Sequence, residues 1–229
     1  MGNGVRRGAE MSSVEKSKYD SEMHQVTWII LNTVRNLKVG KNKLAAFLKG
    51  SKSKEVKPLA QELLYGGLFW YDIPTIAGFI EQLENMNLIQ RKTLEGYNYD
   101  YSVFELTNAG KLVLEEKQKI PLHILKEVKP ITVGDSEEET YELIKQGKTV
   151  SETAQKRNLA VSTIYTHIYR LIFNGRLSSS DAISEDVINK VSDAANKLSN
   201  PTLKLIKDLL PDLSYEEIRC ALAGLRKGN

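Results

Sequence analysis

The sequence predicts a mainly α-helical protein, in which a winged helix with one β-hairpin precedes an all-α helix-turn-helix domain. Three observations carry this prediction. The chain has 229 residues, of which 41% are hydrophobic and 27% charged, as in a soluble protein with room for two domains. Apolar residues recur at helical spacing over most of its length, and two strand-like runs stand close together in its first half.

The first half opens with short amphipathic segments. Apolar residues at helical spacing predict helices over residues 26–37 and 44–48, with a break at Gly40 between them. A third apolar stretch covers residues 56–64 and stops at Gly66-Gly67, because two glycines extend a helix at a high entropic cost.

Two further helices are expected to begin at side-chain caps. Asp72 is a candidate N-cap and Pro74 suits a first helical turn, so a helix is expected from there to about Asn87. Thr107 is the candidate N-cap of a helix over residues 108–114.

A β-hairpin lies between these two helices. Residues 88–92 and 101–106 are strand-like, and the polar tip at residues 95–100 contains Gly96 and Asn98. Helices followed by a hairpin and a closing helix form a winged helix, with the hairpin as its wing.

The second half reads as helical throughout. Ser136 with Glu139 resembles a capping box, and Gly147, Asn158 and Gly175 suit the left-handed ends of helices. Its expected helices span residues 136–146, 150–157, 162–174, 186–198, 202–210 and 215–225. The domain prediction is a flexible lead-in at 1–18, a winged helix at 19–122, a linker at 123–134 and a helix-turn-helix domain at 135–229.

The segment from Thr149 to Ile168 has the pattern of a helix-turn-helix. Ala154 is small enough for two helices to approach, and Leu159 and Val161 can fill the turn between them. The helix that follows would present its first residues to the edges of DNA bases. Packed three-helix units that do not bind DNA share this pattern. The local charge therefore helps to decide between a DNA-binding helix-turn-helix and a purely structural bundle.

Two lysine- and arginine-rich stretches favour nucleic acid. Residues 38–57 hold seven lysines against Glu55 alone, and residues 145–176 hold six basic residues against Glu152 alone. Such clusters are typical of surfaces that contact phosphate backbones.

Enzyme and membrane functions are disfavoured. Gly147-Lys148-Thr149 resembles the end of a phosphate-binding loop, but Glu142 stands where that motif needs glycine. The three histidines lie in separate elements and Cys220 is the single cysteine, so we expect no metal site, no cofactor and no catalytic residues. No apolar run approaches the length of a membrane span, and a cytoplasmic, nucleoid-associated location is expected.

The residues resemble a known family. Phe47-Leu48-Lys49-Gly50-Ser51, Leu64-Tyr65-Gly66 and Phe104-Glu105-Leu106-Thr107 are similar to the RQC winged-helix domain of RecQ-family DNA helicases. Residues 136–225, with Ser162-Thr163-Ile164, resemble the helix-turn-helix domain that follows RQC in many bacterial members. The ATPase lobes and the four-cysteine zinc subdomain of that family have no counterpart here, so the chain looks like a free-standing or excised C-terminal region.

The resemblance implies a non-enzymatic protein that binds duplex or branched DNA in repair, recombination or replication. A helicase or another repair protein is the expected protein partner. In some members an aromatic residue at the wing tip wedges apart the terminal base pair, and Tyr97 and Tyr99 would take that place. Cross-strand packing within the hairpin is the other reading of these tyrosines.

The residues expected to contact DNA lie in the two basic stretches, the wing and the recognition helix. They are Lys38, Lys41, Lys43, Lys49, Ser51, Lys52, Lys54, Arg91, Lys92, Tyr97, Tyr99, Lys148, Ser162, Thr163, Tyr165, Thr166, Tyr169 and Arg170. Two alternatives stay open: a transcriptional regulator that reads an operator through its helix-turn-helix, and an adaptor that binds a protein.

Overall fold

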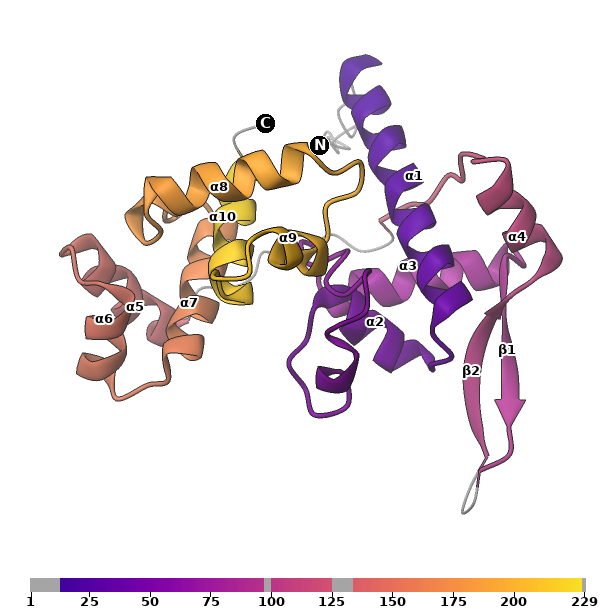
Figure 1. The fold of residues 1–229 in the computed structure, drawn as a ribbon, viewed down its shortest axis with the longest axis horizontal. Coiled ribbons are helices and arrows are strands. Elements are labelled where there is room, and N and C mark those ends of the chain that lie inside the picture. The colour runs from indigo at the N-terminus through magenta and orange to yellow at the C-terminus, as the bar shows by residue number, and fades with distance from the viewer. Residues whose placement is uncertain (1–12, 97–99, 125–133, 228–229) are drawn as a thin grey trace, which may run out of the picture. The chain divides into compact units, whose positions relative to one another are not determined.

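The computed structural model describes residues 13–96, 100–124 and 134–227 (Figure 1). The chain divides into two compact units whose residues alternate along the sequence. The first unit contains the chain up to residue 39 together with residues 79–123, and the second contains residues 40–78 and 124–229. Within the described ranges, no helix is both long enough and apolar enough to span a bilayer.

The first unit combines a long helix with the hairpin. Its elements are α1 (Ser13–Asn36), the second half of α3 (Ile73–Asn85), β1 (Ile89–Leu94), β2 (Tyr101–Leu106) and α4 (Asn108–Glu115). The strands are antiparallel, with Ile89 opposite Leu106 and Leu94 opposite Tyr101. α1 packs on β2 and α4, and its buried side chains include Val26, Ile30 and Val34.

The described part of the second unit is mainly helical, with a long loop between α2 and α3. Its elements are α2 (Lys41–Lys49), the 3-10 turn η1 (Lys57–Leu59), the start of α3, α5 (Asp135–Lys145), α6 (Val150–Arg157), α7 (Val161–Phe173), η2 (Ser179–Asp181), α8 (Glu185–Asn196), α9 (Leu203–Leu209) and α10 (Tyr215–Lys227). α7 packs against α5, α6 and α10, and α10 also contacts α8 and α9. Over the described residues this arrangement, mainly α-helical with one β-hairpin, confirms the predicted fold class.

The predicted helix caps are largely confirmed. The N–H of Thr75 donates to Asp72 at 2.8 Å, and the N–H of Gly110 donates to Thr107 at 3.1 Å. Asn158 ends α6 in the left-handed conformation, with φ of 51°.

Three local predictions differ from the structure. α1 begins at Ser13, ahead of the first apolar residues that indicated it. α5 begins at Asp135, and Glu137 accepts the N–H of Gly134 at 3.1 Å, so the box expected at Ser136 and Glu139 is wrong. Ser136 instead accepts hydrogen bonds from Arg157, through its carbonyl at 2.6 Å and its hydroxyl at 3.0 Å.

The apolar stretch over residues 56–64 forms only the single turn η1. Its backbone carbonyls find partners elsewhere in the second unit. The hydroxyl of Tyr215 donates to the carbonyl of Ala60 at 3.0 Å, and Thr202 donates to that of Leu63 at 2.7 Å. Because tertiary hydrogen bonds satisfy these groups, the segment needs no helix to do so.

One glycine pair gives a stability test. A Cβ at Gly110 in α4 would lie 2.0 Å from the backbone oxygen of Leu88, whereas a Cβ at Gly78 in α3 would meet nothing within 4 Å. Gly110→Ala should therefore lower the free energy of unfolding by about 2 kcal/mol through overpacking. Gly78→Ala should raise it by up to about 1 kcal/mol through helix propensity. Urea unfolding of both variants measures the difference, and equal midpoints would contradict it.

Candidate nucleic-acid interface

A pocket of about 510 Å³ lies in the second unit. It is lined by the end of α2, the turn that follows, and residues of α7 and α10. The pocket gathers Lys49, Ser51, Lys52, Ser162, Thr163, Tyr165, Thr166, Tyr169 and Arg170 from among the residues expected to contact DNA. Two stretches more than a hundred residues apart in sequence therefore share one surface.

The wall of this pocket is built around Tyr169. Its hydroxyl donates to the carbonyl of Phe69 at 3.1 Å, and the ammonium of Lys49 donates to the same carbonyl at 2.5 Å. The Lys49 ammonium also lies 5.2 Å from the centre of the Tyr169 ring. Tyr169 is only 6% exposed, so little of this side chain is accessible for the DNA contact predicted for it. The side of α7 that carries it packs on residues 40–78, which the sequence pattern assigned to another domain.

Arg219 of α10 also lines the pocket, although it was not among the residues predicted to contact DNA. Its guanidinium donates to the carbonyl of Gly50 at 2.7 Å and lies 5.9 Å from the centre of the Tyr169 ring. Burial and the charge of Arg219 lower the pKa of Lys49 to about 7. Only the tertiary fold brings this arginine to the Lys49 turn, so no local motif could have identified it.

The other cations of the pocket are neutralised within the second unit. Lys52 forms an ion pair with Glu216, and Arg170 forms one with Glu137. Lys148 lies on a neighbouring pocket of about 420 Å³, which Tyr165 also lines, and its ammonium is 3.9 Å from Glu152. The charge counted along the sequence therefore overstates the charge available to a ligand.

The remaining lysines of the first basic stretch differ in exposure. Lys54 is exposed, whereas Lys41 and Lys43 in the first turn of α2 are half-buried. Lys54 forms no ion pair among the described residues. It therefore offers a free charge at the surface of the second unit.

The helix-turn-helix is held together by Arg157. Besides Ser136, its guanidinium donates to Thr140 and contacts Glu139 at 3.0 Å. Thr140 in turn lies 2.8 Å from Nδ1 of His167, a buried residue whose pKa is lowered by burial. These contacts join α5, α6 and α7, so Arg157 and His167 have structural roles.

The start of the recognition helix α7 is partly accessible. Ser162 and Thr166 are exposed, and the hydroxyl of Thr166 donates to the carbonyl of Ser162 at 2.9 Å. Thr163 and Tyr165 are half-buried, and burial raises the pKa of Tyr165 to about 12. The side chains of this turn that are accessible to a ligand therefore include those of Ser162 and Thr166.

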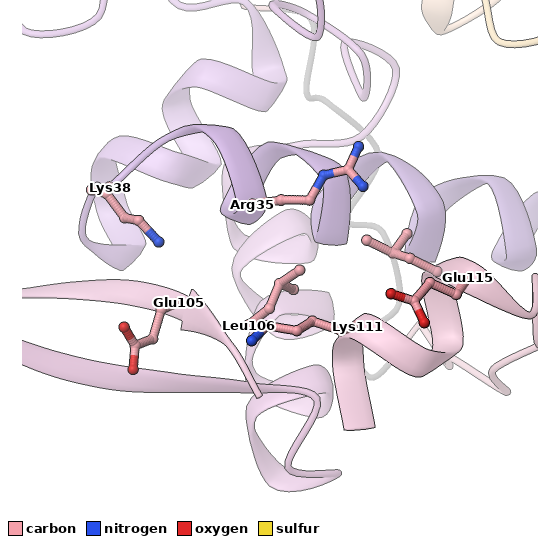
Figure 2. A pocket seen from close by; sticks show the side chains of 7 residues that line it. Arg35, Lys38, Glu105, Leu106, Lys111 and Glu115 are labelled. Carbon is pink, nitrogen blue, oxygen red and sulfur yellow. The ribbon is translucent and has the colours of Figure 1, made fainter. Parts of the chain in front are cut away.

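The first unit has its own basic groove, of about 360 Å³ (Figure 2). Arg35 at the end of α1, Lys38 and Lys111 of α4 line it together with Glu105 and Glu115. Figure 2 shows Lys38 extending toward β2, the strand that carries Glu105. The described residues contain no ion pair to Arg35, Lys38 or Lys111, and of these three only Lys38 was predicted to contact DNA.

The charges of the wing are paired instead. Arg91 contacts Glu84 at 2.7 Å and lies over the ring of Phe104, and Lys92 is 3.6 Å from Glu105. Tyr97 and Tyr99 fall outside the described residues. Their expected stacking on a base pair stays a prediction.

Comparison with known families gives the assignment. Residues 20–130 match the family model of the RQC domain, and residues 136–222 match that of a helix-turn-helix domain. The chain is an RQC domain followed by a helix-turn-helix domain. This order matches the C-terminal region of the RecQ helicases and confirms the predicted resemblance, and no helicase core is matched. Both the RQC and helix-turn-helix domains are non-catalytic DNA-binding domains.

Other comparisons add little to this assignment. No curated protein matches the chain. A solved structure, that of Bacillus subtilis PadR in complex with operator DNA, aligns over 89% of this chain and 90% of its own. The sequence identity is 14% and the TM-score 0.30, values at which the likeness supports no inference about function.

Arg157 and its neighbour Lys156 allow a comparison of a buried and an exposed charge in the helix-turn-helix domain. The Arg157 side chain is 9% exposed and bonded to α5, whereas Lys156 is exposed. Arg157→Ala should lower the free energy of unfolding by about 2 kcal/mol, because it leaves buried polar groups without partners. Lys156→Ala should change it by less than about 0.5 kcal/mol. Urea denaturation followed by circular dichroism measures both, and similar losses would contradict this assignment.

Proposed function

We propose that this RQC and helix-turn-helix chain binds duplex and branched DNA, without catalysing a reaction on it, in DNA repair, recombination or replication. A helicase or another repair protein is the proposed protein partner. The observation that carries the proposal is the pocket that joins the Lys49–Lys52 turn to the start of the recognition helix. We also propose domain boundaries at residues 19–122 and 135–229.

The chemistry of this surface suits a phosphate backbone. It presents hydroxyl groups at Ser51, Ser162 and Thr166 beside the cations Lys49 and Arg219. Side chains of lysine, arginine, serine and threonine supply a large share of protein contacts to DNA phosphates. The groove of the first unit, with Arg35, Lys38 and Lys111, offers a second place for the same contacts.

A sequence-specific regulator is the second candidate, favoured by the exposure of Ser162 and Thr166 at the start of α7. Footprinting and binding curves on forked, blunt duplex, single-stranded and random duplex DNA distinguish the two functions. Protection of one defined sequence would support the regulator. A preference for forks or ends over any sequence would support the branched-DNA proposal, and no binding to any of these substrates would refute both.

The electrostatic part of the proposal predicts strong salt dependence. Each phosphate neutralised contributes about −0.9 to the slope of log affinity against log salt concentration on duplex DNA. Lys43→Gln with Lys54→Gln should therefore make this slope shallower by up to about two, on all sequences alike. The matched control is Lys197→Gln, which changes an exposed lysine just after α8. An affinity that does not depend on salt would refute the electrostatic contribution.

The recognition helix gives a separate test. Thr166→Glu places a negative charge at an exposed position of α7, so it should weaken DNA binding about tenfold by repelling phosphates. Asn189→Glu adds the same charge at an exposed position of α8 and should have little effect. Fluorescence anisotropy with labelled duplex measures both affinities. Equal behaviour of the two variants would show that α7 does not face DNA.

A further inference from the structure

His167 lies inside the helix-turn-helix domain, where α5, α6 and α7 meet. It is 7% exposed, and its Nδ1 lies 2.8 Å from the hydroxyl of Thr140 on α5 and 3.2 Å from Nη1 of Arg157 on α6. A guanidinium has only donors, so the Nδ1 atom that faces Arg157 must accept a hydrogen bond. The imidazole that fits this junction is therefore the neutral one, with its proton on Nε2.

Arg157 cannot move away from His167 without losing its other contacts. The same guanidinium donates to Thr140 and to the carbonyl of Ser136, and it contacts Glu139 at 3.0 Å. Its side chain is 9% exposed, and a guanidinium keeps its charge at any pH at which the chain folds. A proton added to Nδ1 would therefore place a second positive charge 3.2 Å from Arg157, with little water to screen the repulsion.

The other charged groups around His167 offset this repulsion only in part. Burial lowers the pKa of His167 most, Glu137 of α5 raises it, and Arg157 and Arg170 lower it again. The carboxylate of Glu137 already forms an ion pair with Arg170 of α7. The charged residues that line the pocket of the second unit together with His167 are Lys49, Lys52, Arg170, Glu216 and Arg219. Cations thus outnumber carboxylates around the imidazole.

We infer that His167 is an acid-sensitive switch of the helix-turn-helix domain. The neutral imidazole holds Arg157 and Thr140 in place, and the protonated imidazole repels Arg157 and weakens the junction of α5, α6 and α7. The switch goes beyond the proposed DNA binding, because it concerns the stability of the domain itself. Since α7 is the recognition helix, acid should also weaken DNA binding, and this consequence alone rests on the proposed function.

The direction of the pH dependence follows from the lowered pKa of His167. The unfolded chain binds a proton there at the ordinary pKa of 6.5, whereas the folded chain binds it only at a lower pH. The stabilisation from the neutral imidazole is therefore complete above pH 6.5 and is lost as the pH falls through the pKa of the folded state. Each pH unit in which only the unfolded state holds the proton raises the unfolding equilibrium constant by up to about tenfold.

The first test compares urea unfolding of the parent, His167→Gln and His123→Gln in the full chain at pH 7.5 and pH 5.5. A glutamine amide oxygen accepts a hydrogen bond from Arg157 as Nδ1 does, but it does not titrate. His123 is the matched control, because its side chain is exposed. At pH 5.5 the unfolding constant should rise more in the parent and in His123→Gln than in His167→Gln, by up to about tenfold. An equal rise in all three proteins would overturn the switch.

The second test follows the three histidines of the parent by proton NMR as the pH is lowered. The imidazole signal of His167 is assigned by its loss in His167→Gln or, where that variant fails to fold, by elimination with His24→Gln and His123→Gln. It should titrate below pH 6.5, and Arg157→Gln should move the titration to higher pH because it removes the repelling charge. A titration at or above pH 6.5 in the parent, or one that Arg157→Gln does not move, would contradict the inference.

The third test measures affinity for a labelled duplex by anisotropy at pH 7.5 and pH 5.5. The parent should lose more affinity at pH 5.5 than His167→Gln does, since all other titrating groups are common to both proteins. If both proteins bind DNA with the same pH dependence, the proposed function stands and control of DNA binding by His167 is overturned. If the parent binds no DNA at pH 7.5, the proposed function fails, while the unfolding and NMR measurements still decide whether the switch exists.

Discussion

The backbone carbonyl of Phe69 holds the second unit together at the point where its pocket forms. It accepts a hydrogen bond from the hydroxyl of Tyr169 and another from the ammonium of Lys49. The first bond attaches the loop after α2 to α7, and the second orients the end of α2. Arg219 adds a bond from α10 to the carbonyl of Gly50 on the same turn. These bonds bring the basic turn and the recognition helix onto one surface.

Pairing determines which charges remain available to a ligand. Arg157, Arg170 and Arg176 each form an ion pair with a glutamate of α5. Much of the positive charge in the basic stretch around the recognition helix is therefore neutralised within the second unit. Arg91 and Lys92 do the same on the wing. Among the described residues, the cations without acidic partners are fewer than the sequence suggests, and several of them, such as Lys49, Arg219 and Lys38, line the two pockets.

The sequence was a good guide to elements whose signals are local. Asp72, Thr107 and Asn158 mark helix ends through side-chain and backbone chemistry that acts over three or four residues, and all three predictions hold. The resemblance to the RQC and helix-turn-helix domains was also visible, because its motifs are short and continuous. The sequence was a poor guide where contacts between distant parts of the chain determine the burial or conformation of a residue. Tyr169 faces inward and residues 56–64 remain largely non-helical, in both cases because of contacts to segments a hundred or more residues away.

The interleaving of the two units has a consequence for the way the protein is made. The hydrogen bonds that close the second unit join Leu63 to Thr202, Ala60 to Tyr215 and Gly50 to Arg219. During synthesis, residues 40–78 emerge from the ribosome long before α9 and α10. The apolar side chains of residues 40–78 that pack on α9 and α10 therefore stay exposed until those helices are made. Contacts between distant residues slow folding, and exposed apolar surface favours aggregation. The second unit therefore completes its core only after α10 has been synthesised.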